Sequence, residues 1–317
     1  MKDIKLVALD LDGTLFDNSS RISERNLTAI RSITDKGIHV VISTGRPFEG
    51  IPFDQIKGTG INYAITANGS GIYEISTGKC LYENAMDEEL VTPILNFLLT
   101  RDIHMDAFIG GKGYTPVQCV ETAQKLTVPS SIKNYIITTR TRLDNILQFI
   151  HENQLKVQKM TLNFYPAADG TLIDRETVRK FLVSNPSITT VCGGYNNLEF
   201  TRADANKGVG LRKLAEILGV NPDATMAIGD TENDLAIIEA AGIGVAMGNA
   251  TDAVKARADY VTTTNTKDGV AAAIEHFILL FHSQRNNPIF FFKDAMTAST
   301  CRRSVSLPMV KRTLPGA

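Results

Sequence analysis

The chain has 317 residues, and its 33 lysine and arginine residues against 34 aspartate and glutamate residues give a formal net charge of −1. This balance provides no electrostatic basis for nucleic acid or an anionic membrane as the main partner. A hydrophobic content of 43% with 21% charged residues is typical of a soluble globular protein, and the length suffices for two domains. No stretch approaches the roughly 20 apolar residues that a membrane-spanning helix needs.

The cysteines indicate a reducing compartment. Cys80, Cys119, Cys192 and Cys301 are scattered, without the paired spacing of a zinc site or a disulfide framework. The apolar run that follows Asp3 is too short for a signal peptide and ends in carboxylates. We therefore expect a cytoplasmic protein with reduced thiols.

The first chemical signal follows a short apolar run from Ile4 to Leu9, which predicts a buried strand. Asp10 ends this run, and Asp12, Gly13 and Thr14 come directly after it. Two carboxylates at the carboxyl end of a buried parallel strand are costly unless a cation is present, and ligands bind at that edge of such sheets. A calcium loop would need a third ligand and a late glutamate, which are not spaced correctly here. A plain turn with solvated carboxylates remains the alternative.

The next segments predict that the strand belongs to a parallel sheet. Ser23 can cap a helix that Gly37 ends, and Ile38 to Ser43 is a second buried strand, which together make a βαβ unit. Thr44 and Gly45 then lie at the same sheet edge as Asp10, where a hydroxyl and a main-chain N–H suit a phosphate oxygen. A simple turn would explain the same residues.

A third strand, Tyr63 to Ala67, is followed by Asn68 and Gly69, which predict a hairpin turn. From about residue 84 the pattern changes to short strands and helices, including a strand at Ser131 to Thr138 and a helix at Arg142 to Glu152. We find no catalytic constellation in this region, and we expect its histidines, His104 and His151, at surface or half-buried positions. It reads as an α+β unit inserted as a lid over the sheet edge.

Two further polar segments return to the sheet. Lys207 opens a helix, where a lysine is unfavourable for the helix dipole. It is either an ordinary exposed lysine or a cation aimed at Asp10 and a phosphate. The buried strand Ala224 to Ile228 ends in a second acidic segment, residues 229–234, whose Asp234 could simply cap the following helix.

Taken together, four segments resemble the motifs of the haloacid dehalogenase (HAD) superfamily, in its Cof-type branch with a large type 2 (C2B-like) cap. The four segments are Asp10-Leu11-Asp12-Gly13-Thr14-Leu15, Thr44-Gly45-Arg46, Asn206-Lys207-Gly208 and Gly229-Asp230-Thr231-Glu232-Asn233-Asp234. The resemblance covers roughly residues 1–281. It implies an α/β fold: a doubly wound, parallel-sheet (Rossmann-like) core of residues 1–83 and 195–281, with an α+β cap at residues 84–194 inserted into it.

The resemblance also implies an activity. The chain would be a Mg²⁺-dependent phosphatase that hydrolyses a small phosphomonoester through an aspartyl-phosphate intermediate. Asp10 would be the nucleophile, and Asp12 would protonate the leaving oxygen and then serve as the base for water. Oxygen ligands suit Mg²⁺. The implied ligands are the Asp10 carboxylate, the Asp12 main-chain carbonyl and Asp230, with Asp234 acting through water or by orienting Lys207.

The remaining residues of the resemblance would bind the substrate. Thr44, Gly45 and Lys207 would hold the phosphate, and Asn233 would touch it or support Asp10. Arg46 would bind the substrate or form an ion pair with the first loop. In the family an Asn-Gly at the place of Asn68 borders the active site, although a purely structural turn explains Asn68 equally well.

Several alternatives stay open. A phosphomutase of the phosphomannomutase type uses the same site with a similar cap, and a non-catalytic phospho-ligand-binding regulator would also retain the fold. The intact motifs argue against the regulator. Sugar phosphates, nucleotides, flavin mononucleotide and pyridoxal phosphate are all plausible substrates, and the sequence leaves the oligomeric state open. The basic tail, residues 282–317, is an extension packed on the core or a partner, a disordered segment, or the product of an altered reading frame.

Overall fold

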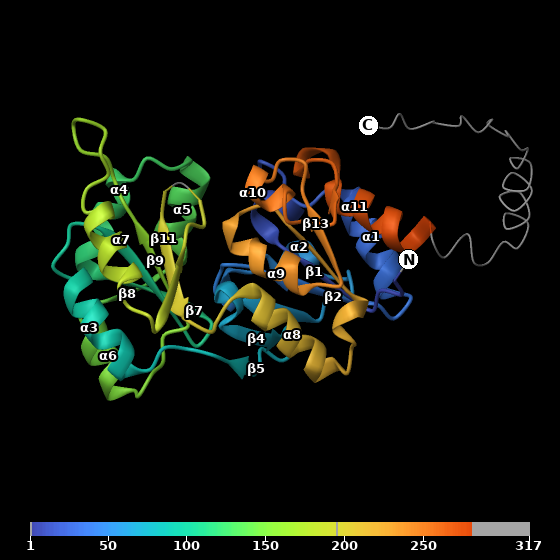
Figure 1. Cartoon of the computed structure of the whole chain (residues 1–317). Helices are drawn as coiled ribbons and strands as arrows, with labels where there is room; N and C mark the ends of the chain where they lie inside the picture. The colour runs from blue at the N-terminus through green and yellow to red at the C-terminus, as the bar shows by residue number, and fades with distance from the viewer. Residues whose placement is uncertain (1, 195, 281–317) are drawn as a thin grey trace, which may run out of the picture.

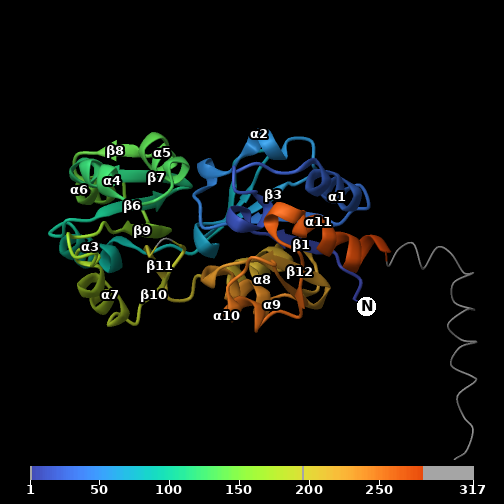
Figure 2. The same cartoon turned by 90° about the horizontal axis from the view of Figure 1, so that it is seen from above.

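The structure is a computed structural model that describes residues 2–194 and 196–280. The basic tail that we considered from the sequence lies outside these residues. Figures 1 and 2 show the chain in two lobes, each built on its own sheet.

The first lobe contains an eight-stranded sheet in the order β14-β13-β12-β1-β2-β3-β4-β5. The strands from β14 to β3 pair in parallel, and β4 and β5 add an antiparallel edge. Its strands are β1 (Leu6–Leu9), β2 (His39–Ser43), β3 (Tyr63–Thr66), β4 (Gly71–Glu74), β5 (Cys80–Glu83), β12 (Thr225–Gly229), β13 (Ile243–Ala246) and β14 (Tyr260–Val261). Its helices are α1 (Glu24–Thr34), α2 (Phe53–Ile56), α8 (Lys207–Leu218), α9 (Leu235–Ala240), α10 (Asp252–Lys255) and α11 (Gly269–Ile274).

Helices cover both faces of this sheet, which explains why its central strands are apolar throughout. In β1, Val7 and Leu9 point into a cluster shared with α1 and α11, whereas Leu6 and Ala8 point into a second cluster shared with α8 and α9. The core is therefore doubly wound, as expected. Ser23 caps α1 by accepting a hydrogen bond from the Asn26 main-chain N–H, also as expected.

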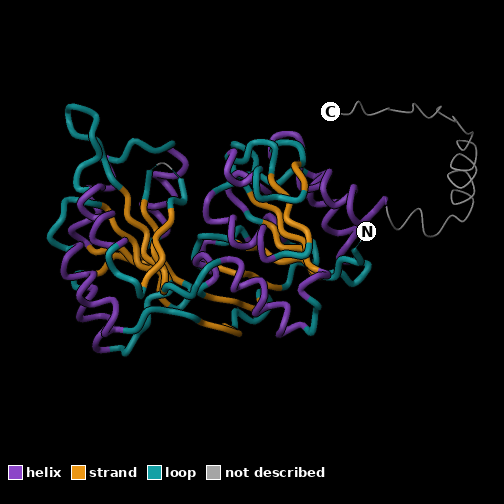
Figure 3. The backbone as a smooth tube through the Cα atoms, viewed as in Figure 1, coloured by secondary structure: helices purple, strands orange, loops and turns teal. Residues whose placement is uncertain are grey.

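The second lobe contains a six-stranded sheet in the order β10-β11-β9-β6-β7-β8, in which all pairs are antiparallel except β7 with β8. Its apolar face packs on α3, α6 and α7, while the opposite face carries buried polar and charged side chains. Figure 3 shows the strands of the two sheets in separate lobes. The elements of this lobe are β6 (His104–Ile109), β7 (Lys112–Pro116), β8 (Thr141–Leu143), β9 (Lys159–Asn163), β10 (Ile188–Val191), β11 (Leu198–Arg202), α3 (Glu88–Leu98), α4 (Val120–Lys125), α5 (Ser130–Thr139), α6 (Ile146–Glu152) and α7 (Arg175–Val183).

Two local predictions in the cap are wrong. The segment predicted as a strand at Ser131 to Thr138 is the helix α5, so the β preference of its branched residues does not decide its structure. The helix predicted from Arg142 begins only at Ile146. The Asn145 side chain caps it by accepting from the Gln148 N–H, which leaves residues 141–143 to pair as β8.

The two lobes have separate hydrophobic interiors. Every buried residue of the two core clusters lies outside residues 84–204, and every residue of the cap cluster lies within them. We propose that the lobes are the two domains expected from the sequence, with the second boundary moved. Strand β11 pairs with β9 and β10, so the chain returns to the core after Arg202 and not at residue 195.

Among the described residues, no helix is both long and apolar enough to cross a bilayer. Cys80, Cys119 and Cys192 are free thiols, and Cys301 lies outside the described part of the chain.

His104 is buried on the polar face of the cap sheet, contrary to the exposed or half-buried position expected, whereas His151 is exposed. The His104 ring lies 3.5 Å from Asp106 Oδ1 and 3.1 Å from Asn163 Nδ2, and Arg140 binds the same Asp106 carboxylate. Burial lowers the pKa of His104; Asp106 opposes this shift and Arg140 adds to it.

This environment predicts a pH-dependent stability. An unfolded histidine titrates near pH 6.5. Between that pH and the lowered pKa of the folded state, the unfolded chain binds a proton that the folded chain does not, and this favours unfolding. Stability from His104 is therefore complete above about pH 6.5 and falls, by at most about 1.4 kcal/mol per pH unit, as the pH drops toward the lowered folded pKa. His104→Asn should lose less thermal stability than the wild type between about pH 7.5 and 5.5.

His151→Asn is the control for that measurement, because the His151 side chain is 75% exposed and its ion pair with Glu88 lies at the surface, where such pairs contribute little to stability. It should follow the wild-type curve of melting temperature against pH. Parallel curves for all three proteins would contradict the role given to His104.

Candidate active site

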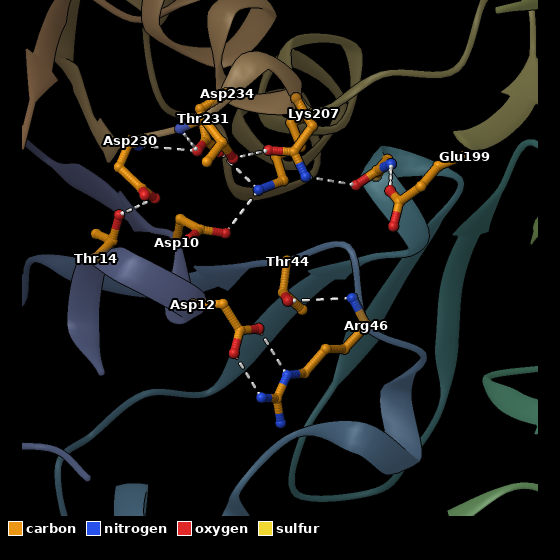
Figure 4. Close-up of polar contacts among 12 residues, drawn as sticks. Asp10, Asp12, Thr14, Thr44, Arg46, Glu199, Lys207, Asp230, Thr231 and Asp234 are labelled. Atoms are coloured by element: carbon orange, nitrogen blue, oxygen red, sulfur yellow. Dashed lines mark hydrogen bonds and ion pairs between the residues drawn. The ribbon is translucent and has the colours of Figure 1, made fainter. Parts of the chain in front are cut away.

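The sequence motifs meet at one edge of the core sheet because they follow neighbouring parallel strands. Asp10 follows β1, Thr44 follows β2, and Asp230 follows β12. These strands are adjacent in the order β12-β1-β2, so their carboxyl ends bring the three side chains together. Lys207, the first residue of α8, reaches the same place from one face of the sheet (Figure 4).

Lys207 is the centre of the cluster. Its ammonium lies 2.7 Å from Asp10 Oδ1 and 2.6 Å from Asp234 Oδ1, and the side chain is fully buried. Burial lowers the pKa of Lys207, but the two carboxylates more than offset this, so the pKa is raised and the side chain stays charged. Of the two interpretations left by the sequence, an exposed lysine is wrong.

Local packing holds this lysine at the start of its helix. The Asn206 side chain caps α8 by accepting from the Val209 N–H at 2.9 Å. Gly208 lies against the main-chain carbonyl of Ala236 in α9, where a β-carbon would clash. The close approach of α8 and α9 is what brings Lys207 within reach of Asp234.

Asp234 makes contacts of both kinds considered from the sequence, with the main chain before α9 and with Lys207. Its Oδ2 accepts from the main-chain N–H groups of Asp230 and Thr231, at 3.0 and 3.1 Å, and so caps the turn before α9. Its Oδ1 holds Lys207. One buried carboxylate therefore fixes both the acidic loop and the lysine.

Three carboxylates are placed to share a cation. Asp10, Asp230 and Asp234 each offer one oxygen, and the three oxygens lie within 4.8 Å of one another. Burial, with repulsion from Asp234 and Asp230, raises the pKa of Asp10 despite the opposing effect of Lys207. Burial and Asp234 raise the pKa of Asp230 to about 7. All the ligand atoms offered by these three carboxylates are oxygens, which suit a hard divalent cation. Such a cation would stabilise the ionised carboxylates, whose charged forms are otherwise costly in this buried cluster.

The carboxylate of Asp12 points away from this cluster (Figure 4). It accepts two hydrogen bonds from Arg46, from Nη2 at 2.6 Å and from Nε at 2.8 Å. The Arg46 guanidinium also lies over the rings of Phe16 in the core and Tyr135 in the cap, 5.2 and 4.6 Å from their centroids. Of the two roles left open for Arg46, the structure shows the ion pair, and it shows a cap residue supporting it.

Asn68 and Asn233 meet beside the loop at Thr44 and Gly45. Asn233 Nδ2 donates to Asn68 Oδ1 at 3.2 Å, and a β-carbon placed on Gly45 would lie 2.9 Å from that same oxygen. Asn68 adopts a positive φ of 56°, which asparagine tolerates well, at the hairpin turn between β3 and β4. The Thr44 hydroxyl accepts from the Arg46 main-chain N–H at 3.1 Å.

Two cap residues that we did not select from the sequence also reach this place. Glu199 of β11 accepts from Asn68 Nδ2 at 2.7 Å, and Lys159 of β9 lies 2.8 Å from Glu199. Both strands alternate polar with apolar residues, so the sequence places Lys159 and Glu199 on the polar side of the cap sheet but does not separate them from the other polar residues there.

Comparisons with known proteins find related hydrolases and phosphatases. A family model described as haloacid dehalogenase-like hydrolase matches residues 7–274. The chain is 34% identical over 282 residues to 5-amino-6-(5-phospho-D-ribitylamino)uracil phosphatase YcsE of Bacillus subtilis, covering 87% of this chain and 97% of that protein. It is similar to the solved structure of a haloacid dehalogenase-like hydrolase from B. subtilis, with a TM-score of 0.75, 28% identity, and coverage of 87% and 100%. It also resembles the HAD subclass IIB sugar phosphatase BT4131, with a TM-score of 0.69, 25% identity, and coverage of 86% and 98%.

Gly13 offers a test of the acidic cluster. Its φ is +85°, and a β-carbon there would overlap the carboxylate of Asp230. Gly37 has a similar φ of +78° but open space around it. Gly13→Ala and Gly37→Ala should each lose about 1 kcal/mol of stability from the strained backbone, while only Gly13→Ala displaces Asp230. We expect the rise in melting temperature on adding MgCl₂ to be much smaller in Gly13→Ala than in Gly37→Ala. Equal rises would mean that Asp230 holds no cation.

Proposed function

The chain belongs to the haloacid dehalogenase-like hydrolase family, and on that premise we propose that it is a Mg²⁺-dependent phosphatase acting on a small phosphomonoester. The observation that carries this proposal is Lys207, buried between Asp10 and Asp234 beside the third carboxylate, Asp230. A fixed cation next to a carboxylate nucleophile suits phosphoryl transfer, in which positioning and charge neutralisation supply most of the catalysis.

Asp10 attacks phosphorus in this proposal. The bond from its carboxylate oxygen to phosphorus forms, the ester bond breaks, and Asp12 gives a proton to the leaving oxygen. In the second half, Asp12 takes a proton from a water molecule that attacks the same phosphorus. Inorganic phosphate leaves, and the Asp10 carboxylate is restored. In this structure Arg46 holds both oxygens of Asp12 away from the acidic cluster, so Asp12 would leave Arg46 in order to reach the leaving oxygen.

The carboxylates of Asp10 and Asp230 and the main-chain carbonyl of Asp12 would hold Mg²⁺, and Asp234 would support it while orienting Lys207. The bound ion would neutralise charge on the phosphoryl group. Thr44, the Gly45 N–H and Lys207 would hold the phosphoryl oxygens, and Asn233 with Asn68 would border them. The 2.7 Å contact between Lys207 and Asp10, and the burial of both residues with Thr44 and Asp230, support this assignment.

The substrate we propose is a phosphorylated sugar or sugar alcohol. The relative named above is a phosphatase of a phosphoribityl compound, and the HAD subclass IIB neighbour is a sugar phosphatase. These names favour hydrolysis over the phosphomutase alternative. The free thiols support a reducing, cytoplasmic setting.

Replacing the nucleophile tests the function directly. Asp10→Asn should fold, since its partner Lys207 keeps Asp234, but phosphate release from sugar phosphates and p-nitrophenyl phosphate should fall by about 10⁴-fold or more. Asp3→Asn makes the same chemical change at an exposed residue on the surface and should release phosphate at the wild-type rate. Activity retained in Asp10→Asn would remove the proposed nucleophile.

The dependence on a cation is tested by chelation. EDTA should abolish phosphate release and MgCl₂ should restore it, because Asp10 and Asp230 would otherwise repel the incoming phosphate. Asp230→Asn removes one ligand and should need about 10- to 100-fold more MgCl₂ for half-maximal rate. Asp252→Asn, at the start of α10, provides the control. Full activity in EDTA would contradict a metal-dependent mechanism.

A further inference from the structure

Lys159 is a buried cation that the proposed mechanism does not use. It lies in the middle of the cap sheet, opposite Phe108 of β6, and only 1% of the residue is exposed. The neighbouring Met160 and Leu162 point to the apolar side of this sheet, so the alternation of β9 directs Lys159 to the polar side. Its ammonium therefore leaves the cap interior and reaches the core.

The ammonium arrives beside the proposed phosphate loop. A β-carbon built on Gly45 would lie 3.2 Å from Lys159 Nζ and 3.5 Å from Asn233 Nδ2. Gly45 is thus faced by two nitrogen donors, one from the cap and one from the core. A side chain at this position would fill the space that separates the loop from the ammonium.

The hydrogen-bonding capacity of Lys159 is only partly used. An ammonium has three N–H donors. Among the described residues, its ion-pair partner is Glu199 at 2.8 Å, and its other recorded contact is the Phe108 ring, 5.0 Å from the ring centroid. The same oxygen of Glu199 also accepts from Asn68 Nδ2.

Lys207 differs in this respect, because it lies between two carboxylates at 2.7 and 2.6 Å. Burying an ammonium costs free energy unless its N–H donors find acceptors, and the Lys159 ammonium has one carboxylate, which it shares with Asn68. An oxygen-rich anion bound at Gly45 would supply that acceptor. Lys207 therefore holds the proposed nucleophile, whereas Lys159 has N–H donors available for a ligand.

We propose that Lys159 is a substrate-binding residue contributed by the cap, which donates a hydrogen bond to a non-bridging oxygen of the phosphoryl group held at Thr44 and Gly45. The inference rests on the proposed function, since it takes that loop as the phosphate site. Glu199 is then a positioning residue that holds the ammonium between Asn68 and the loop. The active site is complete only when the cap lies against the core.

The first experiment measures the binding of inorganic phosphate by calorimetry, in the presence of MgCl₂, to the wild type and to Lys159→Met. Losing a charged hydrogen bond should weaken phosphate binding by about 10- to 100-fold. Lys112→Met is the matched control. Lys112 also forms an ion pair from the cap to the core, with Glu49 at 3.0 Å, but it is exposed. Its phosphate affinity should equal that of the wild type.

A second variant guards against loss of folding. Lys159→Met leaves the Glu199 carboxylate buried without its cation, which is destabilising. The double variant Lys159→Met/Glu199→Gln removes both charges together, and it should fold with the same 10- to 100-fold loss of phosphate affinity. Because the contact is to the phosphoryl group, kcat/KM should fall by a similar factor for p-nitrophenyl phosphate and for every sugar phosphate.

The outcomes separate this inference from the proposed function. Phosphate affinity and kcat/KM within threefold of the wild type in the folded double variant would overturn the role of Lys159, while wild-type turnover would leave the proposed phosphatase intact. A loss that varies strongly between substrates would place Lys159 on the leaving group and would also overturn it. If the wild type releases no phosphate from any substrate but the variants still bind phosphate more weakly, the phosphatase fails and the anion site stands.

Discussion

The salt bridges from Lys207 to Asp10 and Asp234 are the constraint on which the site depends. They join residues from three separate parts of the chain, and all three side chains are buried. Removing Lys207 would leave two like charges unpaired in the interior, which costs several kcal/mol. The close packing of α8 on α9 and the parallel order of β12, β1 and β2 are therefore what the chemistry requires of the fold.

Two further contacts connect the cap with this centre. Tyr135 in the cap supports Arg46, which grips Asp12. Glu199 in the cap holds Asn68, which in turn contacts Asn233. The cap thus reaches the proposed acid–base residue by one route and the proposed phosphate loop by another. A lid that contacts both can couple exclusion of water to assembly of the site.

The core was largely predictable from the sequence, because short apolar runs ending in polar residues are strong local signals. Ser23 and the Asn68 hairpin are cases where the local signal sufficed. The cap was less predictable. Residues 131–138 include β-branched side chains but fold as α5, because intrinsic β propensity is a weak and context-dependent signal. The approach of Lys159 to Gly45 depends on how two sheets face each other, and no local pattern encodes that distance.

The two segments that connect the lobes lie side by side. Asn84, just after β5, donates a hydrogen bond to the main-chain carbonyl of Asp204, just before α8. The entry and exit points of the cap are therefore adjacent, and neither core cluster contains a residue from between them. The core could be closed by a short loop without losing any of its apolar packing. Because the cap is one continuous insertion, a single replacement in the gene could exchange it for another cap and leave the core unchanged.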